Sequence, residues 1–500
     1  MPRARGIGSR ALALTTLVGL ALAGGAAAQK PAPSGAPALP TAKPPPLGAP
    51  MPQAQPAPRP AMPPAAQAPA APRQDAAPDA IPPNEPAAIT RLRGILGPEV
   101  RLSYAGAQAL DGAGERVRLT GVVLEQPDKR ATAEEVFISG LREDGVAEAV
   151  IRGLETEEAG SRIRIGLIRI AGLSVPRDGS GAPPQPDRVR LDALRVEGVE
   201  ATGAMPLRLG LFAVENWVAG QPARVNLEGL EIDRIDGGFV DAMRLARFAV
   251  SGIDFGSTLA ALMREQAPPT RVGRAALDLE GLSLSAGGRP VGGLREMRIA
   301  ADVTRADGSG TGSVAFRGIR VEPVPMIADW LTRFGYQAIE AEITADTAYD
   351  AESGRVELRD LSLAGRDVGT LSFALTLDGV TRERAEAGDM SQMRLISMGL
   401  RYADASLFRR FVAMQSRETR TPEAQLREQL VQMAGGALTQ PGEAALDPIR
   451  EAVQRFIRGQ AETVEIRINP PQPLGMEQLQ GVPPSPGEAQ RLLGITATAR

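Results

Sequence analysis

The residues that most often carry catalysis are missing from this 500-residue chain, which contains no histidine and no cysteine. Without imidazole or thiolate groups there can be no Ser-His-Asp triad, no cysteine nucleophile, no Cys/His zinc site and no thiol redox centre. Lysine occurs only as Lys30, Lys43 and Lys129, and the first two lie in a proline-rich segment. A Ser-Lys dyad or Schiff base would therefore depend on Lys129. Its turn-like surroundings disfavour that role, because a catalytic lysine usually needs a desolvated pocket.

Two polar clusters resemble binding motifs but lack the context that those motifs require. Residues 308–312, GSGTG, are glycine-rich like a phosphate loop, yet no lysine follows and no strand-loop-helix pattern surrounds them. Asp346, Asp350 and Glu352 crowd a turn and could bind calcium, but Gly354 falls too late for EF-hand spacing. We interpret both clusters as hairpin turns. The sequence thus predicts no catalytic, cofactor-binding or metal-binding residues, and no cofactor.

Paired carboxylates remain as the one route to acid–base hydrolysis. Sugar-cleaving sites usually offer aromatic platforms, whereas only 3% of this chain is aromatic and its two tryptophans, Trp217 and Trp330, lie in apolar stretches. The formal net charge of -3 also removes the attraction that drives non-specific nucleic-acid binding. The composition therefore favours a protein that is not an enzyme and has no nucleic-acid partner.

Any binding surface must be built on strands, because apolar and charged residues alternate with a period of two from about Arg101 onward. The clearest segments are RIRIGLIRIAGL (162–173), RVRLDALRVEGV (188–199), RVNLEGLEI (224–232) and RVELRDLSL (355–363). A glycine followed by an aliphatic residue recurs at irregular spacing, at Gly140, Gly153, Gly172, Gly198, Gly229, Gly252, Gly281, Gly318 and Gly379. We predict a long curved antiparallel meander in which these glycines mark bulges or bends near strand ends. Whether the strands form one sheet or two stays open.

Short amphipathic helices are expected to interrupt the strands. Residues 324–335, VPMIADWLTRFG, place one apolar stripe on a helix, and residues 257–266 do so more weakly. That stripe consists of Met326, Ile327, Trp330, Leu331 and Phe334. We expect it to pack on the core, with a membrane-surface role as the alternative.

Residues 401–500 are expected to form a helical subdomain that caps the sheet, next to a β-rich domain at residues 87–400. Three helices are indicated by apolar spacing at Leu407, Phe408, Phe411 and Met414, at Leu426, Leu430 and Met433, and at Leu446, Ile449, Val453, Phe456 and Ile457. A terminal strand follows at residues 463–469. The predicted fold class is therefore mainly β with an α cap.

The first 86 residues do not have the composition of a packed domain. Residues 1–28 combine Arg3, Arg5 and Arg10, an apolar stretch at 11–22, and small residues at Ala26 and Ala28, as in a cleavable signal peptide. An uncleaved inner-membrane anchor is the alternative, since residues 11–28 are just long enough to span. Residues 29–86, rich in proline and alanine, predict a semi-stiff disordered linker. We therefore expect an exported, periplasmic protein.

Residues 348–380, AYDAESGRVELRDLSLAGRDVGTLSFALTLDGV, resemble the β-repeats of AsmA-like envelope proteins. The resemblance implies an elongated sheet with an apolar groove that contacts lipids and supports outer-membrane upkeep, and it transfers no functional residues. The expected function is to bind or shield apolar ligands, lipids above all, in envelope maintenance, with transient membrane contact. A scaffold that binds other envelope proteins through exposed strand edges is the alternative, followed by a carboxylate hydrolase.

Overall fold

The computed structural model describes residues 85–500 except Asp128, 159–160, 177–183, Gly237, Gly388, Met390, 438–445, 476–477 and 479–484. The expected signal peptide at 1–28 lies outside the described residues, as does the expected linker at 29–86 up to Asn84. Residues 86–500 belong to one structural unit. No helix among the described residues is long and apolar enough to cross a membrane.

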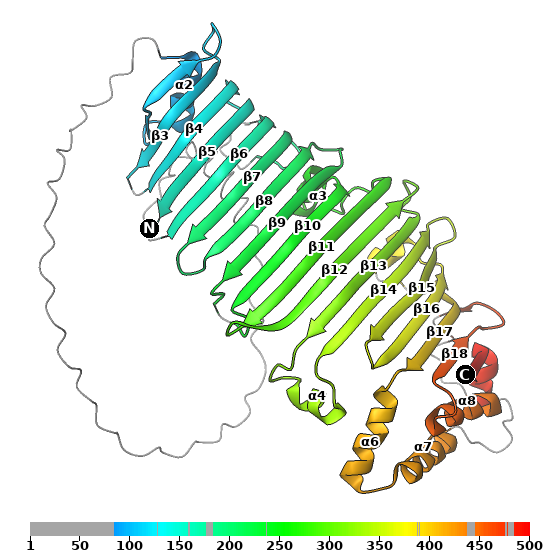
Figure 1. The fold of residues 1–500 in the computed structure, drawn as a ribbon. Coiled ribbons are helices and arrows are strands. Elements are labelled where there is room, and N and C mark those ends of the chain that lie inside the picture. Colours follow the sequence, from blue (N-terminus) through cyan, green and yellow to red (C-terminus); the bar gives the residue numbers. More distant parts are fainter. Residues whose placement is uncertain are drawn as a thin grey trace, which may run out of the picture. The chain divides into compact units, whose positions relative to one another are not determined.

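Twenty strands form one antiparallel sheet (Figure 1). They are β1 (Arg101–Ser103), β2 (Gly106–Ala109), β3 (Arg116–Gln126), β4 (Lys129–Arg142), β5 (Gly145–Glu158), β6 (Ser161–Ser174), β7 (Leu191–Thr202), β8 (Leu207–Trp217), β9 (Ala223–Asp233), β10 (Ala242–Ile253), β11 (Gly273–Ala286), β12 (Arg289–Val303), β13 (Gly310–Val321), β14 (Ile339–Asp350), β15 (Arg355–Gly365), β16 (Gly369–Asp378), β17 (Arg394–Asp404), β18 (Thr463–Ile468), β19 (Leu474–Gly475) and β20 (Ile495–Ala499). From β3 to β18 each strand pairs with the next, as expected of a meander. The strands β1 and β2 flank β3 at one end, and β20 pairs with β18 at the other.

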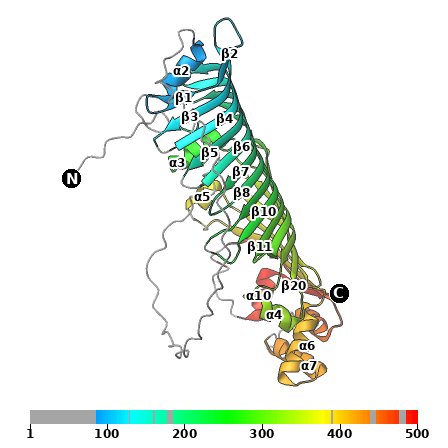
Figure 2. The same ribbon diagram turned by 60° about the vertical axis from the view of Figure 1, so that its left-hand side comes forward.

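The helices lie before, between and after the strands. They are α2 (Ala87–Leu96), α3 (Phe255–Met263), α4 (Ala328–Phe334), α5 (Arg382–Ala387), α6 (Leu407–Thr419), α7 (Glu423–Ala437), α8 (Asp447–Arg458) and α10 (Pro486–Leu493). Because neighbouring strands are antiparallel, the connections after odd-numbered strands share one long edge of the sheet, which we call the α4 edge. The opposite edge carries α3 and α5. Figure 2 shows α2, α3 and α5 on the same side of the sheet.

The alternation in the sequence sorts the side chains onto two faces. Residues that lie directly opposite on neighbouring strands share a face, so Ile165 and Val199 lie on one face, whereas Arg164 and Glu200 lie on the other. The registers repeat this sorting from β3 to β18. We call the two surfaces the apolar face and the polar face.

Left-handed residues interrupt the strands in two transverse rows. All nine glycines singled out from the sequence have φ between +59° and +80°, a conformation that residues with a Cβ rarely adopt. One row crosses the odd-numbered strands from β3 to β13 at Gly121, Gly153, Gly198, Gly229, Gly281 and Gly318. The other crosses the even-numbered strands from β4 to β10 at Gly140, Gly172, Asn216 and Gly252. These residues are not among the paired positions of their strands. Gly153, for example, lies between the Arg152–Leu167 pair and the Leu154–Ile165 pair.

The recurring glycines thus mark interruptions of the strand pairing, but most of them do not lie at strand ends: Gly153 and Gly229 lie well inside β5 and β9, and the register is the same on both sides of each. Register shifts of the kind that a β-bulge produces occur at Gly252, between Ser251 and Ile253, and around Gly318, between Phe316 and Ile319. Such bulges bend a strand and increase its twist. Two members of the rows, Gly121 and Asn216, were not predicted from the sequence. Asn216 has φ +58° and its side-chain amide donates a 2.9 Å hydrogen bond to the Pro222 carbonyl, and asparagine is one of the few other residues that tolerates this conformation.

On the polar face, one cross-strand row alternates acid and base from β5 to β10. Its members are Glu155, Arg164, Glu200, Arg208, Glu231 and Arg244. Arg164 Nε lies 3.4 Å from Glu155 Oε2, and Arg244 Nε lies 3.8 Å from Glu231 Oε1. Each exposed pair contributes little by itself. Their alternation keeps both signs interspersed on the face opposite the core.

The C-terminal helices α6, α7 and α8 and the strand β18 lie where the sequence places them, but residues 401–500 are not separated from the sheet. The strands β18 and β20 continue the pairing from β17, and α8 packs on that end through Ile449 and Ala452 against Ala497 and Ala499. The boundary expected between residues 400 and 401 thus lies inside β17. Neither α10 nor β20 was expected from the sequence.

The apolar stripe of α4 does not form part of the core as expected. Only Leu331 is buried, whereas Met326 and Trp330 are exposed. The reason is that α4 lies in the β13–β14 connection, which projects from the α4 edge of the sheet (Figure 1).

Candidate functional site

The residues considered for catalysis or metal binding are not assembled into a site. Lys30 and Lys43 lie outside the described residues, and Lys129 is the first residue of β4, opposite Gln126. Among the described residues, no group of three or more histidine, cysteine, aspartate or glutamate side chains could hold a metal ion.

The glycine-rich segment at 308–312 belongs to the hairpin between β12 and β13. The Thr304 N–H donates to the Ser309 carbonyl at 2.8 Å, the Gly308 N–H donates to the Arg305 carbonyl at 3.0 Å, and β13 begins at Gly310. The interpretation as a hairpin turn is confirmed.

An arginine from the neighbouring hairpin, Arg305, contacts the acidic turn considered for calcium. The Arg305 guanidinium pairs with Asp350 and lies 3.5 Å from Asp307 and 3.7 Å from Glu352. Hydrogen bonds from the side chain and the backbone N–H of Ser353 lower the pKa of Asp350, and the hydrogen bond from Arg305 acts in the same direction. Asp346 lies within β14, opposite Asp360. The cluster is therefore an arginine-centred contact between two hairpin turns.

A hollow between α2 and the β4–β5 hairpin has a volume of about 470 Å³ and charged walls. Arg91 donates to both Glu115 oxygens, at 2.7 and 3.1 Å, and to the Leu141 carbonyl at 2.6 Å. The hydrogen bond from Arg91 also lowers the pKa of Glu115. These contacts hold α2 against the sheet, so the charged groups of this hollow have a structural role.

The apolar face is the larger feature, and its two halves differ in cover. At the N-terminal end α2 packs on β3 to β5, where Ile89, Val117 and Leu119 are fully buried. At the long edge opposite the α4 edge, the ring of Phe255 in α3 stacks on Trp217 of β8, with 5.8 Å between the ring centres. At the C-terminal end α8 covers β18 and β20.

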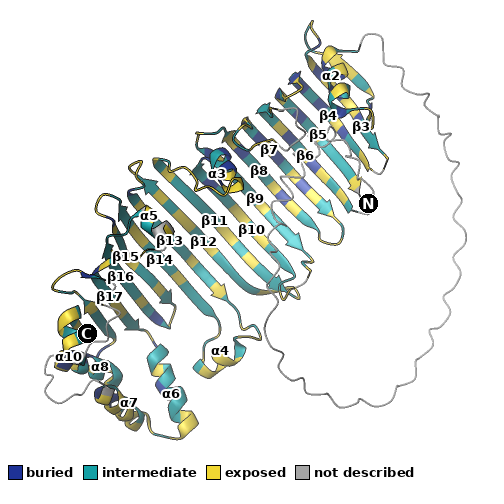
Figure 3. Cartoon of the chain, turned by 180° about the vertical axis from the view of Figure 1, so that it is seen from behind, coloured by how far each residue is buried: buried dark blue, intermediate teal, exposed yellow. Residues whose placement is uncertain are grey.

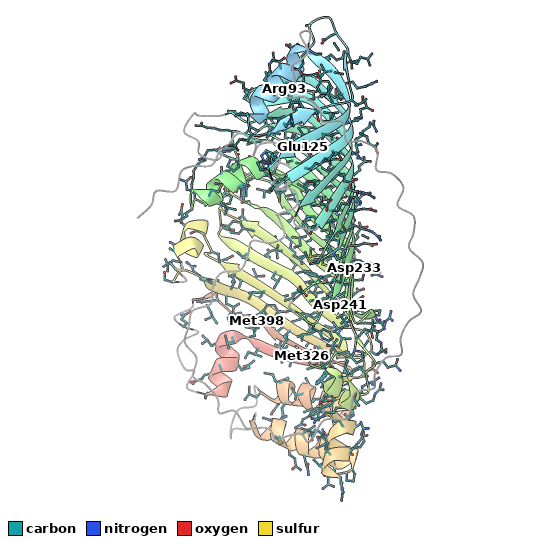
Figure 4. The ribbon with its side chains drawn as sticks, turned by 90° about the vertical axis from the view of Figure 1, so that its left-hand side faces the viewer. Arg93, Glu125, Asp233, Asp241, Met326 and Met398 are labelled. Carbon is teal, nitrogen blue, oxygen red and sulfur yellow. The ribbon has the colours of Figure 1, made fainter. Side chains whose placement is uncertain are left out.

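Between these covers, the apolar face of β11–β17 is only partly buried, and we call it the open face. Four aliphatic residues on it are 38–43% exposed: Ile299, Leu363, Leu371 and Leu400. Figure 3 shows the buried positions concentrated in the strands near α2, whereas β11–β17 are mostly intermediate and exposed. Met398, marked in Figure 4, belongs to this surface.

Three central rows of side chains cross the open face. They begin at Met297, Ile299 and Ala301 of β12, and in strand register they continue to Leu371, Phe373 and Leu375 of β16. Thr347 is the one position in these rows with a polar side chain, and its hydroxyl donates to the Gly312 carbonyl. Six strand spacings of about 4.8 Å give a length of about 29 Å across β11–β17. This length exceeds the roughly 15 Å that acyl chains occupy in one bilayer leaflet.

The chemistry of the open face is that of an aliphatic surface. Its backbone groups are engaged in strand pairing, and its side chains offer almost no hydrogen-bonding groups. Contiguous exposed apolar surface of this kind is uncommon on soluble proteins and marks interaction sites. The alternating pattern is visible in the sequence, but the strands that remain uncovered could not be predicted from it, because cover depends on helices placed by the tertiary fold.

Residues 362–500 match the model of a family described as "Uncharacterized protein". The match begins in β15 and extends through the C-terminal helices and strands. No curated protein matches the chain. The resemblance to AsmA-like proteins therefore remains an expectation from the sequence.

Proposed function

We propose that this is a non-enzymatic protein of the bacterial envelope that binds or shields the acyl chains of lipids on its open face. The observation that carries the proposal is the continuous aliphatic surface across β11–β17, with residues such as Leu363 and Leu371 about 40% exposed. Burying such surface against an acyl chain is favourable by about 25 cal/mol per Å². Location in the periplasm and a part in envelope maintenance belong to the same proposal and rest on the N-terminal sequence.

Lipid is the favoured ligand because the surface is aliphatic and nearly free of polar groups. Ligand pockets for polar small molecules add a few convergent polar groups that fix orientation. Protein interfaces are enriched in aromatic residues and arginine, whereas the central rows of the open face contain mainly leucine, isoleucine, valine and alanine.

The first test is native mass spectrometry of the protein purified under mild conditions, followed by titration with a fluorescent acyl-chain probe. The double substitution Leu363→Asp with Leu371→Asp places two charges on neighbouring strands of the open face. We expect the probe affinity to fall at least about tenfold, which corresponds to about 1.4 kcal/mol.

The matched control is Ser362→Asp with Ser372→Asp, which adds the same charges to the adjacent cross-strand pair on the polar face. This control should retain the wild-type affinity. Equal losses in both variants, or a wild-type protein that neither carries lipid nor binds the probe, would contradict the proposal.

The second candidate function is a scaffold, and the strand β20 favours it. Among the described residues β20 pairs with β18 alone, so Ala497 and Ala499 direct backbone groups toward an edge that another strand could extend. Recovery of a stoichiometric protein partner without lipid would support this alternative.

A further inference from the structure

We propose that the α4–α6 end of the protein docks on an anionic lipid surface, with Met326 and Trp330 as the inserted residues. This surface, which we call the tip, is separate from the open face. The proposal does not depend on ligand binding there.

The tip exposes large apolar side chains where the chain projects beyond the strands. Met326 is 94% exposed and Trp330 is 41% exposed. Both lie in the β13–β14 connection, on the same long edge as the β9–β10 loop, whose ends Asp233 and Asp241 are marked with Met326 in Figure 4. Side chains that project in this way can contact a flat surface, whereas side chains inside a concave ligand site cannot.

The tip is held rigidly to α6 rather than being a loose loop. Arg410 Nη1 donates to the carbonyls of Phe334 at 3.0 Å and Gly335 at 2.6 Å, and its guanidinium lies 4.3 Å from the centre of the Tyr336 ring. The Trp330 ring stacks on Tyr336 at a distance of 6.0 Å between ring centres and packs in a tilted arrangement against Phe334 at 4.8 Å. The aromatic cluster thus presents Trp330 in a fixed position, which reduces the entropy lost on docking.

The two helices of the tip are rich in arginine. Residues 407–420 contain four arginines and one glutamate, and Arg333 adds a further cation in α4. Within the described part of the chain, no ion pair with a carboxylate is found for Arg333, Arg409, Arg417 or Arg420, all of which are exposed. The tip can therefore offer guanidinium groups to phosphate oxygens.

An anionic bilayer surface can accept both the exposed apolar side chains and the guanidinium groups of the tip. Tryptophan is enriched at the headgroup level of membranes, where its ring is partly apolar and partly hydrated. Basic residues near the membrane surface are attracted to the negative charge of anionic lipids. Met326 is 94% exposed and projects from the surface instead of filling a recess, so we favour the lipid surface over a protein.

The test is flotation of the full chain with vesicles in a density gradient. We expect the protein to float with vesicles containing phosphatidylglycerol, and to float several-fold less with pure phosphatidylcholine or at high salt, because surface charge interactions are screened. The variant Met326→Ser with Trp330→Ser should lose about tenfold in vesicle affinity. The variant Arg417→Glu with Arg420→Glu, which leaves the aromatic cluster intact, should lose binding to anionic vesicles selectively.

The matched control is Phe239→Ser, which removes a comparably exposed apolar residue from the β9–β10 loop on the same edge. It should float like the wild type, and all variants should keep the wild-type circular dichroism spectrum. Failure of the wild type to float, equal loss in the control, or recovery of a stoichiometric protein on the tip in place of vesicle binding would overturn the proposal. Acyl-probe binding at the open face should be unchanged in the tip variants, so the two proposals fail separately.

Discussion

The two halves of the apolar face are built from strands with the same alternating pattern, but they differ in how far their apolar side chains are buried. In the strands β3–β8, residues such as Leu119, Ile165 and Val199 are almost fully buried, whereas their counterparts Ile299 and Leu371 in β11–β17 remain substantially exposed. Strand alternation therefore decides which face is apolar, and the cover decides whether that face becomes a core. An uncovered face forgoes about 25 cal/mol of stabilisation per Å² in the free protein, which a bound acyl chain would restore.

The halves also differ in backbone. Left-handed residues occur in each strand from β3 to β11 and again in β13, whereas within β14–β17 only Gly369, the first residue of β16, has positive φ. The remaining irregularities are three register shifts, between Asp346 and Thr347, between Leu358 and Leu361, and between Thr376 and Leu377. The interruptions of pairing at the glycine rows thus belong mainly to the covered half and the strands next to it.

The largest expected difference between the halves is in the response to cavity formation. Leu119→Ala removes a fully buried side chain from β3, and Leu371→Ala removes one from β16 that is 40% exposed. We expect the first to lower the free energy of unfolding by about 2–5 kcal/mol and the second by less than about 1 kcal/mol. Urea unfolding at unchanged m-value measures both. Equal losses would mean that the open face is covered in solution.

Replacing a glycine of the two rows by alanine should destabilise the protein by an amount that depends on the space around that glycine. A Cβ on Gly229 would meet nothing closer than the Gly210 backbone nitrogen at 3.6 Å, so Gly229→Ala should cost only the left-handed strain, about 1–2 kcal/mol. A Cβ on Gly252 would lie 1.9 Å from the Arg274 carbonyl oxygen, so Gly252→Ala should cost clearly more. Gly94→Ala in α2, where no atom lies within 4 Å, is the control and should stabilise the protein by up to about 1 kcal/mol. Thermal unfolding of the three variants in parallel would reveal any departure from this order.

How far the sequence predicts this molecule depends on the range of the interactions involved. The period-two pattern is local, and it predicted the antiparallel meander that the structure confirms. The recurring glycines predicted where strand pairing is interrupted, although a register shift occurs at only a few of them. The spacing of Leu426, Leu430 and Met433 likewise predicted α7. The exposure of Met326 could not be predicted, because an amphipathic stripe is the same whether its helix packs on a sheet or projects beyond it. The open face escaped prediction for the same reason: Ile165 and Ile299 both belong to alternating apolar patterns, yet they are 2% and 39% exposed, and this difference depends on tertiary packing that the local sequence does not record.

The smallest expected effect concerns the polar face behind the covered half. Arg164 lies between Glu155 and Glu200 in the cross-strand row, so Arg164→Glu would place three like charges side by side. We expect a loss of about 0.5–1 kcal/mol at low salt, and a smaller loss at about 1 M salt, where the Debye length is about 3 Å. Arg169→Glu is the matched control on the same strand, because Arg169 faces Arg195 and its reversal should cause no loss. Chemical unfolding at two salt concentrations separates the cases, and a loss at Arg164 that does not change with salt would indicate side-chain packing rather than charge as its cause.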